Sequence, residues 1–141
     1  MSQPVLQVSP YRVAQTAHLG LVLGVVIIVL IFAIARPTLG EEPTAELTTA
    51  FRIASVALMF VTVVAMRLVR ARIEPIRSRD DRDAWWQVNL PKAIIVWALA
   101  DGAAMVGSVF WLLTGDYVIL AVVTGVALAL LVMHRPAVME M

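Results

Sequence analysis

Four runs of apolar residues divide the chain, each close to the roughly 20 residues that a helix needs to cross a bilayer. They cover residues 18–35, 53–69, 93–113 and 118–133. None has the polar face that a helix of a water-soluble bundle requires, and none alternates polar with apolar residues as a β-barrel strand does. The pattern predicts an all-α, polytopic membrane protein, a bundle of four transmembrane helices in a single domain.

Composition supports this class. Of the 141 residues, 61% are hydrophobic and 15% are charged, and the mean hydropathy is +0.89. An ordinary soluble domain is about half apolar and about a quarter charged. The chain has no cysteine, which excludes disulfides, thiol nucleophiles and cysteine-ligated metal sites.

The basic residues lie mainly on one side of the predicted membrane. The two tails, the loop over residues 70–92 and the adjoining end of the second run hold nine of the 11 Lys and Arg residues. The other side has Arg36 and Arg52 together with several acidic residues. Because basic loops stay in the cytoplasm, we expect both termini there and a location in the bacterial cytoplasmic (inner) membrane.

The basic loop over residues 70–92 is a candidate docking site. Arginines beside a membrane attract anionic headgroups by about 1 kcal/mol each, and tryptophans favour the interface. The loop either docks a partner or a lipid, or only fixes topology among the headgroups. Alternating Asp and Arg residues over 79–83 make it a poor nucleic-acid site. The candidate docking residues are Arg70, Arg72, Arg77, Arg79, Trp85 and Trp86.

One acidic residue, Asp101, lies inside the third apolar run. A lone charge at such depth costs at least about 2.5–3.5 kcal/mol, so the carboxylate has to be neutral, paired or in a wet cavity. Arg67 in the second run lies at a similar distance from the cytoplasmic edge, roughly 9 Å against roughly 12 Å by helix rise. Thr62 is a possible hydrogen-bond donor to either residue.

Three interpretations of Asp101 stay open. It forms a structural ion pair with Arg67, it is a protonatable site in ion or proton movement, or it contacts a subunit or ligand. The first makes the chain a non-enzymatic accessory or scaffold component, with the Asp101–Arg67 pair as an internal polar lock. The second makes it a proton- or ion-conducting oligomer.

The remaining patterns predict packing rather than chemistry. Small residues recur four apart, as in Gly20-xxx-Gly24 and Ala103-xxx-Gly107, and close helix contacts use such stripes. We expect them to point into the bundle, or to serve a homo-oligomer or larger complex. His18 and His134 are placed where a haem or metal could be held, but terminal histidines are more often interfacial anchors. We expect no cofactor, no metal and no catalytic residue.

The third run and the end of the fourth resemble a widespread group of small bacterial four-span membrane proteins of unknown function. The resemblance rests on Ala98-Leu99-Ala100-Asp101-Gly102, on Leu113-Thr114-Gly115-Asp116 and on Arg135-Pro136. Asp101 stands where that group has Glu. The resemblance implies four spans and an important carboxylate, without an activity. The segment around Asp101 is also locally similar to the acid-bearing helix of rotor-ring proteolipid c subunits.

Overall fold

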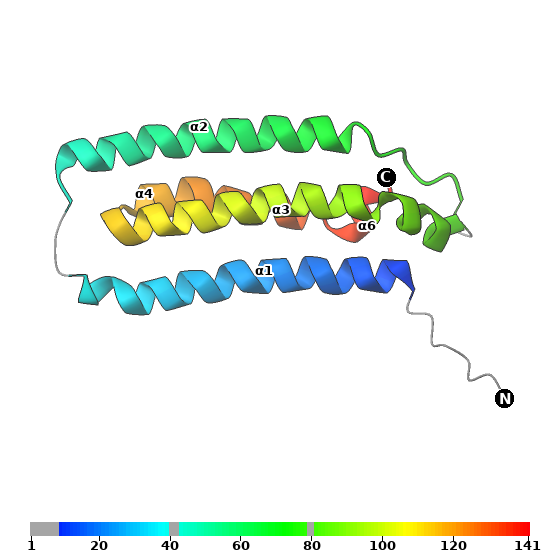
Figure 1. The fold of residues 1–141 in the computed structure, drawn as a ribbon, viewed down its shortest axis with the longest axis horizontal. Helices are drawn as coiled ribbons and strands as arrows, with labels where there is room; N and C mark the ends of the chain where they lie inside the picture. Colours follow the sequence, from blue (N-terminus) through cyan, green and yellow to red (C-terminus); the bar gives the residue numbers. More distant parts are fainter. Residues whose placement is uncertain (1–8, 40–42, 79–80) are drawn as a thin grey trace.

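The computed structural model describes residues 9–39, 43–78 and 81–141, and within these ranges every regular element is a helix (Figure 1). Three helices are long, and a rod of three shorter elements follows them. The long helices are α1 (Pro10–Ala35), α2 (Ala45–Arg70) and α3 (Arg82–Thr114), and the rod consists of α4 (Tyr117–Ile119), the π-helical turn η3 (Leu120–Gly125) and α5 (Val126–Met133). Two single turns, η1 (Arg36–Thr38) and α6 (Pro136–Met139), follow α1 and the rod.

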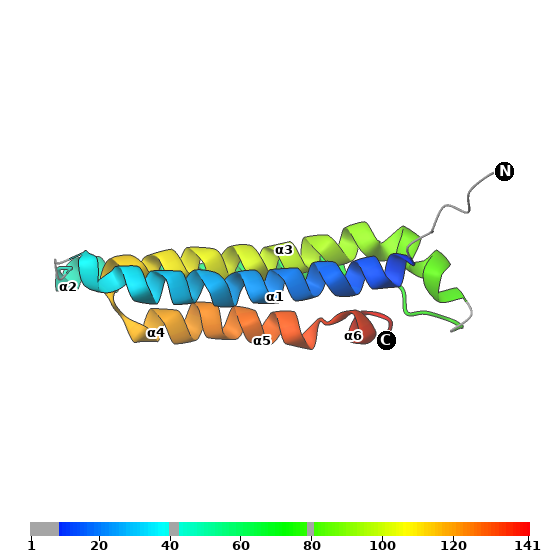
Figure 2. The same ribbon diagram turned by 90° about the horizontal axis from the view of Figure 1, so that it is seen from below.

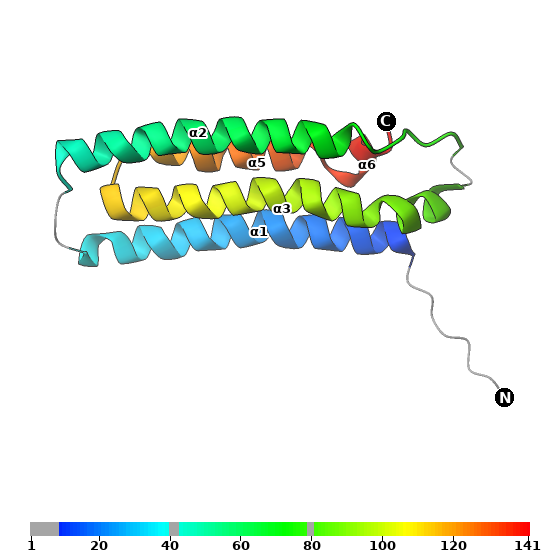
Figure 3. The same cartoon turned by 45° about the horizontal axis from the view of Figure 1, so that its top comes forward.

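Helix α3 is the centre of the fold. Figure 1 shows α1 and α2 on its two sides, and Figure 2 shows the rod running beside α1 and α3. In the tilted view of Figure 3 the rod lies next to α2 as well. The α3 face toward these neighbours contains Val96, Trp97, Ala100 and Ala104, which are fully buried. The core is therefore built around one helix.

The outward surface of the long helices is apolar. In the most apolar 18-residue stretch of α1, with η1 included, only 6% is buried in the fold. The corresponding buried share is 22% in α2 and 44% in α3. Ile34 is 80% exposed and Phe60 is 71% exposed. Soluble monomers rarely expose such wide apolar surfaces. By length and composition, α1 with η1, α2 and α3 can each cross a membrane, and the rod over residues 117–133 is a shorter apolar helix.

Helix α3 begins earlier than the apolar pattern indicated. The loop expected over residues 70–92 ends at Arg82, and Pro91 lies inside the helix. Proline leaves one carbonyl of the preceding turn without its amide donor. Side chains also hold the first turns: Asn89 Nδ2 donates to the Trp85 carbonyl over 3.0 Å, and Trp86 is fully buried with its Nε1 donating to the distant Glu140. Tertiary contacts thus keep this segment helical.

Of the two stripes named above, the one in α3 makes a close helix contact and the one in α1 does not. Ala103 and Gly107 of α3 are buried, and a Cβ on Gly107 would lie 2.5 Å from Val123 Cβ in the π-helical turn η3. Gly20 and Gly24 of α1, in contrast, are exposed and would meet nothing within 4 Å. The expectation that the small faces all point inward was therefore wrong for α1, because this helix turns other residues toward α3.

Candidate functional site

Asp101 lies near the middle of α3 and is half-buried. It follows Trp97 by four residues, which places the two on one helix face. The Trp97 ring contacts the His18 ring of α1 with centroids 5.1 Å apart. Asp101 therefore lies toward the α1 side of α3. Within the described residues its side chain has neither a hydrogen-bond partner nor an ion-pair partner.

The structure does not bring Arg67 to Asp101. Arg67 follows Ile53 and Phe60 at intervals of seven residues, and these two are 67% and 71% exposed, so the three share the outer face of α2. Thr62 is buried, yet it donates to neither residue in the described part of the chain. The depths along the two helices match, but the faces differ, and the expected ion pair is not formed.

The end of the molecule opposite the basic loop is closed by a turn between α3 and α4. Gly115 ends α3 with φ 67°, and its amide donates to the Trp111 carbonyl over 2.7 Å. Asp116 is the N-cap residue of α4, and its carboxylate accepts from the Val118 amide over 2.9 Å. A left-handed residue favours glycine, and a Cβ on Gly115 would overlap the guanidinium of Arg36. The turn is thus fixed by its own sequence.

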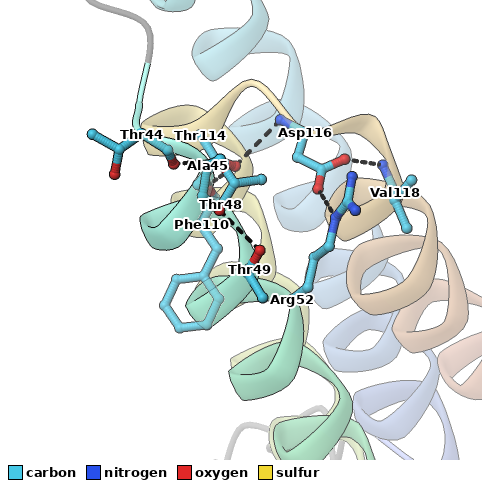
Figure 4. Close-up of polar contacts among 9 residues, drawn as sticks. All are labelled: Thr44, Ala45, Thr48, Thr49, Arg52, Phe110, Thr114, Asp116 and Val118. Atoms are coloured by element: carbon cyan, nitrogen blue, oxygen red, sulfur yellow. Dashed lines mark hydrogen bonds and ion pairs between the residues drawn. The ribbon is translucent and has the colours of Figure 1, made fainter.

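Helix α2 is tied to this turn by an ion pair (Figure 4). Arg52 Nε donates to Asp116 Oδ2 over 2.5 Å, and the Asp116 side chain is 8% exposed. Beside it, the Phe51 and Phe110 rings pack with centroids 4.7 Å apart. The hydrogen bond from Arg52 lowers the pKa of the Asp116 carboxyl, and the Val118 amide lowers it further. In the sequence, Arg52 and Asp116 served only to predict which side of the membrane each loop faces. The Leu-Thr-Gly-Asp segment was the sequence feature that could have indicated this turn.

Replacing Asp116 by asparagine should make stability less dependent on acid pH. Because the folded-state pKa is lowered, ionised Asp116 stabilises the fold above its unfolded pKa of about 3.9 and loses this effect as pH falls through the lower folded value. The wild type should therefore exceed D116N in Tm at pH 7, and the difference should shrink toward pH 3. Thermal unfolding in detergent measures it, and a constant difference would contradict the ion pair.

The opposite, basic end is closed around Glu140. Arg82 donates to its carboxylate through Nε over 2.6 Å and through Nη2 over 2.9 Å. Trp86 Nε1 adds a bond of 2.8 Å, and the Tyr11 ring lies 3.5 Å from the Arg82 guanidinium carbon. The Ile76 amide donates to the Glu140 backbone carbonyl over 3.0 Å. Glu140 thus joins α3 through its carboxylate and the loop after α2 through its backbone carbonyl, and Arg82 extends the contact to Tyr11 of α1. Nothing in the apolar pattern indicated this cluster.

The two histidines bond to backbone carbonyls near the same end. His18 Nε2 donates to the Leu131 carbonyl over 2.8 Å, and His134 Nδ1 donates to the Leu130 carbonyl over 2.8 Å. Trp97 Nε1 donates to the His134 carbonyl over 2.7 Å. His18 and Trp97 therefore fasten α1 and α3 to the end of the rod, while the His134 ring bonds within the rod's own last turn.

Comparison of the chain with protein-family models, with curated proteins and with solved structures found no match.

The candidate docking residues separate into an inner and an outer set. Trp86 is buried against Glu140, and Arg70 Nη1 donates to the Ile73 carbonyl over 3.1 Å, so both serve the fold. Trp85 Nε1 donates to the Glu74 carbonyl over 2.8 Å, and its ring lines a surface pocket together with Arg72 and Arg77. Arg79 lies outside the described residues.

Proposed function

We propose that the chain is a four-span, non-enzymatic integral membrane protein of the bacterial cytoplasmic membrane that serves as an accessory or scaffold component. The rod is the fourth span, and both termini face the cytoplasm. At about 1.5 Å per residue its 17 residues extend about 25 Å, near the thickness of a hydrocarbon core. The chain acts by assembling with other membrane helices, as a homo-oligomer or within a larger complex.

The apolar outer surface supports the membrane location. The exposed side chains of α1 and α2 are aliphatic or aromatic over most of their length, as at Ile34 and Phe60. The ion pairs of the described residues lie near the two ends of the helices, at Asp116, at Glu74 and at Glu140. A bilayer requires this distribution, because its core accepts apolar side chains and its interfaces accept charges.

The observation that carries the assembly role is the unpartnered carboxylate of Asp101. With Arg67 on another face, no cation among the described residues compensates it. A half-buried acid at this depth is costly unless another chain supplies a hydrogen bond or a charge. The outward glycines Gly20 and Gly24 leave room for close approach of a second helix to α1, next to the side of α3 on which Asp101 lies.

The test compares the wild type with Asp101→Asn and Asp101→Leu, each expressed in bacterial membranes and purified in mild detergent. The size of the assembly is measured by native gel electrophoresis, and proton flux is measured after reconstitution into liposomes. We expect Asp101→Leu to give a smaller assembly, and none of the three proteins to conduct. Asp116→Asn is the matched control, since it removes the same charge outside the spans and should leave the assembly unchanged.

Two outcomes would overturn this proposal. Proton flux through the wild type that Asp101→Asn abolishes would establish conduction, with Asp101 as the protonatable group. An unchanged assembly size in Asp101→Leu, with no flux in any variant, would exclude Asp101 as an intermolecular contact.

A further inference from the structure

A pocket of about 440 Å³ opens at the basic end of the molecule. Its walls are the loop that follows α2 and the first three turns of α3. The loop wall is anchored to the α3 wall, because the Trp85 indole of α3 donates to the Glu74 carbonyl of the loop over 2.8 Å. A hydrogen bond thus joins the two walls of the pocket and fixes its shape.

Two cations stand at one side of this pocket. Lys92 Nζ donates to the Arg72 carbonyl over 3.1 Å and to Asn89 Oδ1 over 3.3 Å. An ammonium group has three protons, so one remains for a ligand. The Arg72 guanidinium has no partner among the described residues. The lysine is thus held in place, and the arginine is available.

The charged side chains of the pocket leave one positive charge in excess. Arg77 Nη2 lies 3.9 Å from Glu74 Oε2, and the Arg77 and Glu74 side chains are 91% and 84% exposed. Asp81 is the remaining carboxylate of the lining. Three cations against two carboxylates give the lining a net charge of +1. An anion of one charge fits this balance.

An apolar strip leads from the pocket along α3. Val88 lines the pocket and is 68% exposed, and Ile95, seven residues further on, is 49% exposed on the same face. The 33 residues of α3 extend about 50 Å, well beyond a hydrocarbon core of about 30 Å. The first turns of α3 then lie at headgroup depth, with the strip running toward the acyl chains. A soluble anion would leave this strip unused.

We propose that this pocket binds an anionic phospholipid. Arg72 and Lys92 contact its phosphate, while Val88 and Ile95 lie along an acyl chain. The inference rests on the proposed function in one respect, which is that the chain crosses the membrane with its basic end at the cytoplasmic leaflet. It adds a defined lipid to a surface that otherwise attracts headgroups only diffusely.

The experiment titrates the purified protein in neutral detergent with phosphatidylglycerol and follows its thermal unfolding. Phosphatidylcholine tests the need for net charge, and glycerol 3-phosphate tests whether the headgroup alone suffices. We expect stabilisation by phosphatidylglycerol only. Removing both cations in R72Q/K92Q should weaken the apparent affinity roughly thirtyfold, and R72Q alone about fivefold. The single variant keeps the test valid if loss of Lys92 disturbs the fold.

The matched control is R12Q/R135Q, which removes two exposed cations at the same end but outside the pocket. Its affinity should stay within about twofold of the wild type. An equal loss in both double variants would show diffuse attraction, and equal stabilisation by glycerol 3-phosphate or phosphatidylcholine would exclude an anionic lipid. Each of these results overturns the inference.

Carbonate extraction of the host membranes separates the two proposals. Release of the chain by carbonate would overturn the proposed function. Retention in the membrane, together with no preference for phosphatidylglycerol, would overturn only the lipid pocket.

Discussion

Replacing Trp97 by alanine is expected to lower the free energy of unfolding by about 3–5 kcal/mol. The Trp97 side chain is fully buried, its ring contacts His18 of α1, and its indole donates to the His134 carbonyl over 2.7 Å. The variant loses the packing of three segments at one point and leaves a cavity in the core. Denaturant titration in detergent micelles, followed by circular dichroism, measures the change.

Two further variants separate the causes. Trp97→Phe keeps an aromatic ring but removes the hydrogen bond, and it should cost about 1 kcal/mol from the bond, plus a smaller packing term. Phe60→Ala removes a ring that is 71% exposed on α2, and it should leave the stability in detergent nearly unchanged. Equal effects of Trp97→Ala and Phe60→Ala would show that the Trp97 contacts are not formed.

Replacing Gly107 by alanine should destabilise the fold by about 1–3 kcal/mol, although alanine favours helix. The added Cβ would lie 2.5 Å from two atoms of Val123, so α3 and η3 have to separate. The separation would also strain the bonds from Thr124 Oγ1 to Ser108 Oγ, 3.2 Å, and to the Ala104 carbonyl, 3.3 Å. Thermal unfolding in detergent reports the loss.

Gly102→Ala provides the matched control on the same helix. A Cβ on Gly102 meets nothing within 4 Å, so this variant should gain up to about 1 kcal/mol from helix propensity. The opposite signs at Gly102 and Gly107 distinguish a packing effect from propensity. Stabilisation at both positions would contradict the contact between α3 and η3.

The apolar pattern was sufficient to predict an all-helical chain and its three long helices, but not all of their ends nor the division of the fourth run into α4, η3 and α5. The expected run over residues 18–35 is the apolar part of α1, which begins eight residues earlier at Pro10. The start of α3 was missed because Pro91 and the charged residues before it are typical of a loop. The contacts that keep Arg82–Lys92 helical come from Glu140 and Tyr11, which are distant in sequence.

At the candidate site, too, the sequence predicted what depends on position along one helix and missed what depends on contacts between helices. Helix rise placed Asp101 and Arg67 at similar depths, since depth follows from residue number alone. Which faces of two helices meet depends on packing, and that packing turns Arg67 outward beside Phe60. Lys92 was recognised as a basic residue, but its position beside Arg72 depends on the fold of the loop between α2 and α3.

The central place of α3 has a consequence for biosynthesis. Helices α1 and α2 leave the ribosome first, yet they lie on opposite sides of α3 (Figure 1) and bury little of their surface by themselves. Neither can complete its packing until α3 has been translated and inserted. In the proposed membrane location, α1 and α2 would stay in the bilayer without their α3 contacts until then, so insertion and tertiary assembly would be separate events in time. Chains truncated before α3 should be quality-control substrates rather than folded fragments.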